Sequence, residues 1–201
     1  MHLFETIFNK SQEKHPKSSR GSTPLEYAAE CGHLEICAFI VTRIEDKNPK
    51  INEYGSTPLH SAAGRGHLKV CEYLLQQVDD KNPENNFGST PLHYAAARGH
   101  LKVCEYLIQQ IDEKNPRARD GWTPLHTAAM GGHLKVCEYL IQQIDDKNPR
   151  NNRGFTPMHS AARKGHLAIC ELIQSKVADK NPADNDGTTP QMLAARFMNS
   201  L

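Results

Sequence analysis

The chain has 201 residues, a length that accommodates one or two compact domains. It carries 24 Lys and Arg residues against 23 Asp and Glu, a net charge of +1 that excludes a globally basic nucleic-acid-binding protein and an acidic, self-repelling chain. No run approaches the roughly 18 apolar residues of a membrane-spanning helix, and the first residues lack the basic and apolar regions of a signal peptide. We therefore expect no membrane insertion and no secretion signal.

Glycine, proline and cysteine recur at a fixed interval along the chain. Six glycines mark it, with one spacing of 34 residues followed by four of 33: Gly21, Gly55, Gly88, Gly121, Gly154 and Gly187. All 12 prolines fall into two columns with this interval, and five of the six cysteines form another column. A constant period of this length indicates a stacked repeat array rather than a domain with a single core.

The N-terminal residues match the second half of this period. The Glu-Lys-His-Pro sequence that ends at Pro16 aligns with the Asp-Lys-Asn-Pro sequence that ends at Pro149. In this alignment Phe4, Ile7 and Phe8 fall on apolar positions of a later unit. We interpret the segment as a degenerate second helix with no first helix before it.

The unit that begins at Gly55 predicts two helices and an extended segment. A Thr-Pro pair ending at Pro58 is a favourable helix start, and Gly66 is a favourable helix end. From Leu68 onward the apolar residues follow an i, i+3, i+4, i+7 pattern, which predicts a second helix. Pro83 pushes the residue before it out of the helical region, so an extended finger follows. At the other end of the chain, the last Thr-Pro pair predicts a first helix with no second helix after it.

The repeated motif Gly-x-Thr-Pro-Leu-His-x-Ala-Ala-x-x-Gly-His-Leu-x-Val resembles the ankyrin repeat. Three units carry the whole string, those that begin at Gly55, Gly88 and Gly121. The next unit differs only by Met158 for Leu and Ile169 for Val. The resemblance implies an all-α ankyrin-repeat solenoid of stacked helix-turn-helix units with β-turn fingers, and a role in binding another protein.

We predict a single ankyrin-repeat domain over residues 1–201. Residues 1–20 form an N-terminal half-repeat or cap, and residues 187–201 form a C-terminal half-repeat. Five full repeats lie between them, at 21–54, 55–87, 88–120, 121–153 and 154–186. A fragment of a longer structural array is an alternative, because the last half-repeat keeps apolar residues instead of a polar outer face: Leu193, Phe197, Met198 and Leu201.

Several positions depart from the usual ankyrin pattern. Where most repeats end the second helix with glycine, this chain has β-branched residues: Ile44, Val78, Ile111, Ile144 and Val177. Because such residues adopt positive φ only at a cost, we expect these helices to end without a left-handed cap and this column to pack under the finger. In the first repeat, Thr23 and Glu26 replace the usual Thr-x-x-His and predict a capping box.

The histidine columns do not predict a metal site or a cofactor. Equivalent residues on stacked helices lie roughly 8–10 Å apart, too far to share one zinc ion. We expect the first column to support the Thr-Pro turn and the second to cap the second helix. No nucleophile, base and acid set and no phosphate-binding glycine loop is visible, so we predict a non-enzymatic protein. The acidic pairs, each beside a lysine, are interpreted as solvated loop charge.

The cysteine column predicts free, buried thiols. Neighbouring repeats hold these residues beyond the roughly 7 Å that a disulfide permits between Cα atoms. Cys31 stands outside the column, near a helix end, and is expected to be more accessible. Free thiols are typical of a reducing compartment, so we predict a cytoplasmic or nuclear protein.

The positions at which the repeats differ predict the binding surface. From Lys50 to Lys164, finger and first-helix positions carry nine cations against three anions, a local excess of +6. Four aromatic residues fall in the same strip, and Arg with aromatic residues is the composition of interface hot spots. The candidate partner-binding residues are Tyr54, Arg65, Phe87, Arg98, Arg117, Arg119, Trp122, Arg150, Arg153, Phe155, Arg163 and Lys164.

We therefore predict a monomeric scaffold that binds a partner protein on its concave finger and first-helix face. The cations favour an acidic or phosphorylated partner segment, with Trp122 as its apolar anchor. A solvated surface with scattered Arg is the simplest alternative. A polyanion- or nucleic-acid-binding module is another, which the near-zero net charge and the Glu and Gln of the second helices disfavour.

Overall fold

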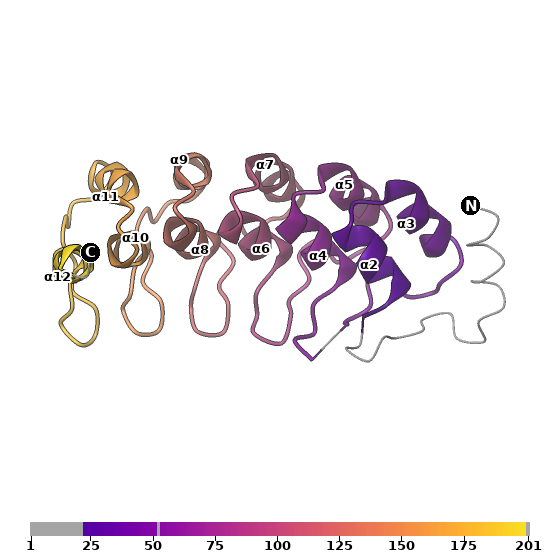
Figure 1. The fold of residues 1–201 in the computed structure, drawn as a ribbon, viewed down its shortest axis with the longest axis horizontal. Coiled ribbons are helices and arrows are strands. Elements are labelled where there is room, and N and C mark those ends of the chain that lie inside the picture. The colour runs from indigo at the N-terminus through magenta and orange to yellow at the C-terminus, as the bar shows by residue number, and fades with distance from the viewer. Residues whose placement is uncertain (1–21, 52, 200–201) are drawn as a thin grey trace.

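The computed structural model describes residues 22–51 and 53–199, which form helices and no strand. Two rows of helices are stacked side by side along the molecule (Figure 1). The first row consists of α2 (Pro24–Glu30), α4 (Pro58–Arg65), α6 (Pro91–Ala97), α8 (Pro124–Gly131), α10 (Pro157–Arg163) and α12 (Pro190–Met198). The second row consists of α3 (Leu34–Val41), α5 (Leu68–Gln76), α7 (Leu101–Gln110), α9 (Leu134–Gln143) and α11 (Leu167–Gln174). The predicted all-α stack of helix pairs is confirmed.

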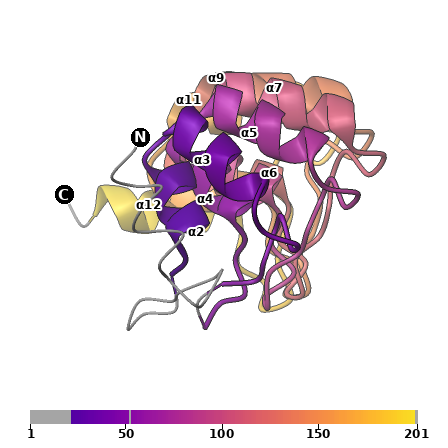
Figure 2. The same ribbon diagram turned by 90° about the vertical axis from the view of Figure 1, so that its right-hand side faces the viewer.

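The fingers are the loops that lead from each second helix to the next first helix. Viewed along the stack, they project from the first helices on the side opposite the second helices (Figure 2). We call the surface made by the fingers and the first helices the finger face. The half-repeat predicted for residues 1–20 lies outside the described residues, as does Leu201. Within the described part, no helix is long and apolar enough to cross a membrane.

The Thr-Pro-x-His motif starts each regular first helix. In α4, the backbone N–H of Thr57 donates to Nδ1 of His60 at 3.1 Å, and Pro58 occupies the first helical position. The other imidazole nitrogen, Nε2, lies 2.9 Å from the carbonyl oxygen of Ser89 in the next finger and donates to it. The first histidine column therefore supports the turn, as predicted, and also joins each repeat to the next.

The first repeat keeps the threonine cap in a modified form. The Thr23 hydroxyl oxygen accepts from the backbone N–H of Glu26 at 3.2 Å, which is one half of the predicted capping box. The Glu26 carboxylate accepts a hydrogen bond from the Ser61 hydroxyl of the following repeat at 3.4 Å.

The second histidine column does not cap the second helix, contrary to our prediction. His100 stands at the N-cap position of α7, but its side chain makes no capping hydrogen bond. The ring turns back over Gly66, where Nε2 lies 3.1 Å from the carbonyl oxygen of Gly64 in the preceding repeat. Gly66 has φ of 80°, and a Cβ added there would lie 2.6 Å from the His100 ring. Glycine is needed both for the left-handed turn and for this close approach.

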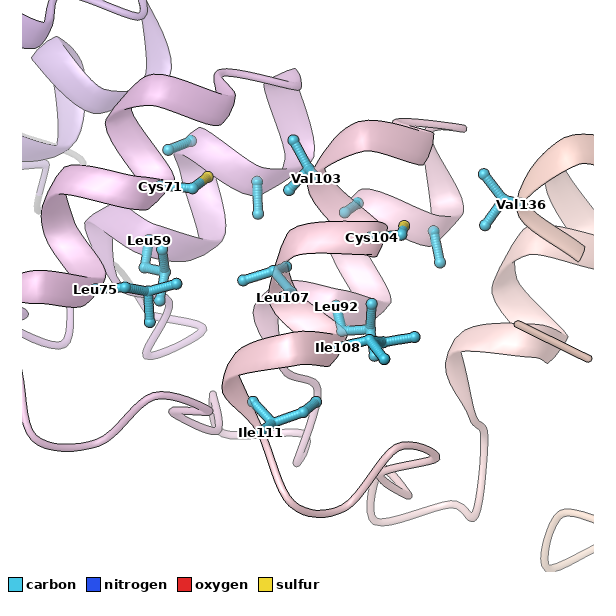
Figure 3. Packing of buried hydrophobic residues seen from close by; sticks show 14 of the residues in the cluster. Leu59, Cys71, Leu75, Leu92, Val103, Cys104, Leu107, Ile108, Ile111 and Val136 are labelled. Atoms are coloured by element: carbon cyan, nitrogen blue, oxygen red, sulfur yellow. The ribbon is translucent and has the colours of Figure 1, made fainter. Parts of the chain in front are cut away.

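The core runs without interruption between the two rows of helices. In α7, Val103, Cys104, Leu107 and Ile108 are all buried, and equivalent residues of the neighbouring repeats pack beside them (Figure 3). Small alanines on the first helices permit the close approach that such packing requires.

The second helices end without a left-handed cap, as predicted. The C-cap residue Ile111 is extended, with φ of −119° and ψ of 149°. Of the β-branched column, Ile44, Ile111 and Ile144 are buried, whereas Val78 and Val177 are half-buried.

Lysines from the loops replace the missing caps. The Lys81 ammonium group donates to the carbonyl oxygens of Leu75 and Val78, each at 2.5 Å. The same arrangement recurs four more times among the described repeats, at Lys47, Lys114, Lys147 and Lys180. A cation suits the negative end of a helix dipole, so these lysines have a capping role that we did not predict. The acidic pairs beside them are exposed, as expected of solvated loop charge.

All six cysteines are free, as predicted, but the column is not buried throughout. Cys37, Cys71, Cys104 and Cys137 are fully buried, whereas Cys170 is half-buried because α11 packs against a second helix on only one side within the described chain. Burial raises the pKa of the four buried thiols to about 12 and that of Cys170 to about 11.

These environments predict the reactivity of the thiols. In the native, unreduced protein, Cys31 is expected to react quickly with a thiol reagent because it is exposed. Cys170 is expected to react slowly, because the thiolate is the reactive form and burial raises the pKa of this thiol. The four buried thiols are expected to react only after denaturation, which brings the count to six. Fewer than six reactive thiols in the denatured, unreduced protein would contradict the absence of disulfides.

Candidate protein-binding groove

The fingers form a row that is held together by backbone hydrogen bonds. The N–H of Arg119 donates to the carbonyl oxygen of Phe87 in the preceding finger at 2.9 Å. Equivalent bonds of 2.8 to 3.0 Å link three further pairs of neighbouring fingers: Asn86 to Tyr54, Asn152 to Asp120, and Asn185 to Arg153. The spacing of the side chains along the row is therefore fixed by the fold.

Three of the predicted binding arginines make contacts within the protein. Arg117 Nη2 donates to the carbonyl oxygen of Arg150 at 2.7 Å, and Arg150 Nη2 donates to that of Ala183 at 2.5 Å. Both guanidinium groups thus brace one finger against the next. Arg65 lies beside the carboxylate of Glu30 in the preceding repeat, with Nε at 3.1 Å and Nη2 at 2.5 Å.

The other cations among the candidate binding residues are exposed and make no side-chain hydrogen bond or ion pair with the described residues: Arg98, Arg119, Arg153, Arg163 and Lys164. Their positive charge is partly offset by acids outside the segment from which the excess was counted. Asp184 and Asp186 line a hollow with Arg153 and Arg163. The finger face therefore carries mixed charge, with exposed cations among carboxylates.

The aromatic residues of the strip form two pairs. The ring centroids of Tyr54 and Phe87 are 6.1 Å apart, and those of Trp122 and Phe155 are 6.3 Å apart and stacked. Tyr54 and Phe87 are 49% and 57% exposed, whereas Trp122 and Phe155 are half-buried. Apolar surface that remains this exposed on a rigid row is suited to contact with a partner.

Three adjoining hollows form a groove across the finger face. The first, of about 420 Å³, lies over the first helices from α2 to α8 and includes Glu26, Glu30 and Arg98 in its lining. The second, of about 320 Å³, lies between two fingers and shares Ser89, His93 and Thr127 with the first. The third, of about 490 Å³, shares Asp120 and Trp122 with the second. The groove thus passes from the first helices of the early repeats to the fingers of the later ones.

Sequence reasoning missed Tyr94, which lines the first hollow. Its hydroxyl group lies 3.1 Å from Ser56 Oγ and accepts from Nδ2 of Asn85 at 3.1 Å, and its ring meets His60 edge-on. The sequence does carry a signal for Tyr94, because the equivalent residues of the neighbouring repeats are the small Ser61 and Thr127.

Comparison with protein-family models agrees with this geometry. A model described as ankyrin repeats (3 copies) matches the chain in five overlapping segments: residues 2–85, 45–120, 76–151, 110–184 and 143–201. The chain belongs to the ankyrin-repeat family. A separate comparison with curated proteins found no match.

Membership in the ankyrin-repeat family gives the general function. Ankyrin repeats are protein–protein interaction modules, and members of the family are typically non-enzymatic scaffolds. Within residues 22–51 and 53–199, no group of three His, Cys, Asp or Glu side chains is arranged to hold a metal ion.

The histidines on this face are structural and neutral. Burial lowers the pKa of His60, His93 and His126 to about 4, and it also lowers the pKa of His159. His60 and His93 line the groove, and both nitrogens of each ring are bonded to the backbone, so neither brings a positive charge to it.

Proposed function

We propose that this ankyrin-repeat domain is a monomeric scaffold that binds a segment of a partner protein along the groove of its concave finger face. The observation that carries the proposal is the rigid finger row, which holds two aromatic pairs beside cations without internal partners. A fixed row of aromatic and Arg side chains offers contact area at a low entropic cost to the protein.

The partner segment is proposed to be acidic or phosphorylated. Arg119 and Arg153 project from neighbouring fingers on either side of Trp122, and neither side chain is paired within the described residues. Their charges are expected to increase the association rate and its salt dependence more than the final affinity. Nucleic acid is disfavoured as the ligand because the net charge of the chain is only +1, whereas binding along a phosphate backbone draws on many cations.

Two variants of the complex captured from lysate test the proposed face. We expect Trp122→Ala to weaken binding by about 30-fold, which corresponds to a hot-spot loss of about 2 kcal/mol. We expect the double variant Arg119→Glu with Arg153→Glu to slow association and to remove its dependence on salt. Binding constants from surface plasmon resonance at two salt concentrations measure both effects.

The matched control changes the opposite surface. A variant with Glu72→Lys and Gln109→Ala alters the second helices and is expected to bind like the wild type. If this variant abolishes binding while both finger-face variants bind normally, the partner sits on the second-helix side and the proposal is wrong.

A further inference from the structure

The aromatic residues of the fingers change position halfway along the row. Tyr54 and Phe87 each precede the finger glycine of their repeat, whereas Trp122 and Phe155 each follow it. Rings in the same column contact each other, at 6.1 Å for the first pair and 6.3 Å for the second. No ring contact joins Phe87 to Trp122 in the described structure, because the column changes between their two repeats.

The second hollow of the groove lies at this change of column. Phe87 and Trp122 are both part of its lining, and the two positions that no aromatic ring fills carry Ser89 and Asp120. Its volume of about 320 Å³ is at the lower end of ligand pockets, which suits one side chain rather than a whole small molecule.

The inner part of this hollow is apolar in character. Ala118 is buried there, and His93 is held by the backbone at both ring nitrogens. Its Nδ1 accepts from the N–H of Thr90 at 3.1 Å, and its Nε2 donates to the carbonyl oxygen of Trp122 at 3.2 Å. No hydrogen-bonding group of the imidazole remains for a ligand, and most of the exposed surface that lines the hollow is apolar. The hollow therefore favours an apolar side chain over a polar one.

The rim of the hollow carries one available cation. Arg119 is exposed, and its guanidinium group has no hydrogen bond or ion pair with the described residues. The neighbouring Asp120 already accepts a hydrogen bond from the N–H of Trp122 at 3.1 Å. A carboxylate on the ligand would therefore meet the guanidinium group at the rim.

We propose that the hollow between Phe87 and Trp122 is the anchor pocket of the groove, and that it takes one apolar side chain of a partner segment that carries a carboxylate in an adjacent position for Arg119. The proposal rests on the proposed function, and it adds the chemistry that the partner must have. In this proposal the apolar residue of the partner inserts between Phe87 and Trp122 instead of packing on the Trp122 ring alone.

Random peptides displayed on phage and selected on the wild-type domain provide the probe. Selected peptides are expected to share an apolar residue with Asp or Glu within a few positions. Trp122 is the only tryptophan of the chain, so its fluorescence reports binding of each synthetic peptide directly. Replacing the shared apolar residue with alanine is expected to weaken binding at least tenfold.

Filling the pocket tests its position. Ser89→Phe places a ring in the column used by Trp122 and Phe155, and it is expected to weaken binding of the selected peptides at least tenfold. Thr188→Phe is the matched control, because it extends the same column on the far side of Phe155 and leaves the hollow open. Melting temperatures establish that both variants fold. If Ser89→Phe does not fold, Phe87→Ala replaces it in the test, because it removes one wall of the pocket.

The coupling between protein and peptide decides the outcome. If the pocket holds the apolar residue, its replacement with alanine weakens binding to the wild type and has little further effect on Ser89→Phe. If Ser89→Phe binds as tightly as the wild type while Arg153→Glu weakens binding, the anchor pocket is wrong and the proposed function stands. If no selected peptide responds to any finger-face variant, both are wrong.

Discussion

Acidification from pH 7 to pH 5 is expected to destabilise the fold by about 2 kcal/mol for each of His60, His93 and His126. Burial lowers the pKa of these imidazoles from 6.5 to about 4, so the unfolded state binds protons first as the pH falls. The stabilisation is fully present above pH 6.5, decreases between pH 6.5 and 4, and is lost below pH 4. Protonated Nδ1 would also no longer accept the threonine N–H.

Urea denaturation followed by circular dichroism at pH 7, 6 and 5 measures this loss. In a His126→Gln variant, the difference between pH 7 and pH 5 is expected to shrink by about 2 kcal/mol, because one titrating site is gone. Carboxylates contribute little over this range, since their ordinary pKa values lie near 4. A free energy of unfolding that stays constant from pH 7 to pH 5 would contradict the neutral, buried state of the column.

Gly99→Ala is expected to destabilise the protein by about 3 kcal/mol. Gly99 has φ of 77°, which costs an alanine about 1–2 kcal/mol. The added Cβ would also lie 2.5 Å from Nδ1 of His133, whose ring bonds the carbonyl oxygen of Ala97 at 3.0 Å. Displacing the ring removes that hydrogen bond between repeats, for about 1 kcal/mol more.

Gly187→Ala separates the two contributions. Gly187 has nearly the same φ, 78°, but nothing lies within 4 Å of the position that a Cβ would take. Its substitution is expected to cost only the backbone strain, and chemical denaturation measures both variants. The double variant Gly99→Ala with His133→Ala should show favourable coupling. Equal costs for the two glycines would mean that the close histidine has no energetic role.

The period and the Thr-Pro-Leu-His motif were sufficient to predict the fold, because each residue type in them has a local role. Two recurring contacts were not predictable from that local chemistry. The helix-start position of His100 suggested a cap, but its partner is Gly64 in the preceding repeat. The capping role of Lys114 depends on carbonyl groups three and six residues earlier, which only the folded loop brings within reach of its ammonium group.

The candidate site was predictable in composition but not in shape. The aromatic and Arg positions follow from how the repeats differ, which is visible in the sequence. The bracing role of Arg117 depends on where the next finger lies. The hollow beside Trp122 depends on the relative position of two rings from different columns, which no single position encodes.

The hydrogen bonds between fingers have a consequence for the thermodynamics of binding. A free loop that becomes ordered in a complex loses conformational entropy, at about 1–2 kcal/mol for each residue that is fixed. Here the N–H groups of Asn86, Arg119, Asn152 and Asn185 already tie each finger to the one before it. That entropy is lost when the chain folds, so the fingers lose little further conformational entropy when a ligand binds in the groove.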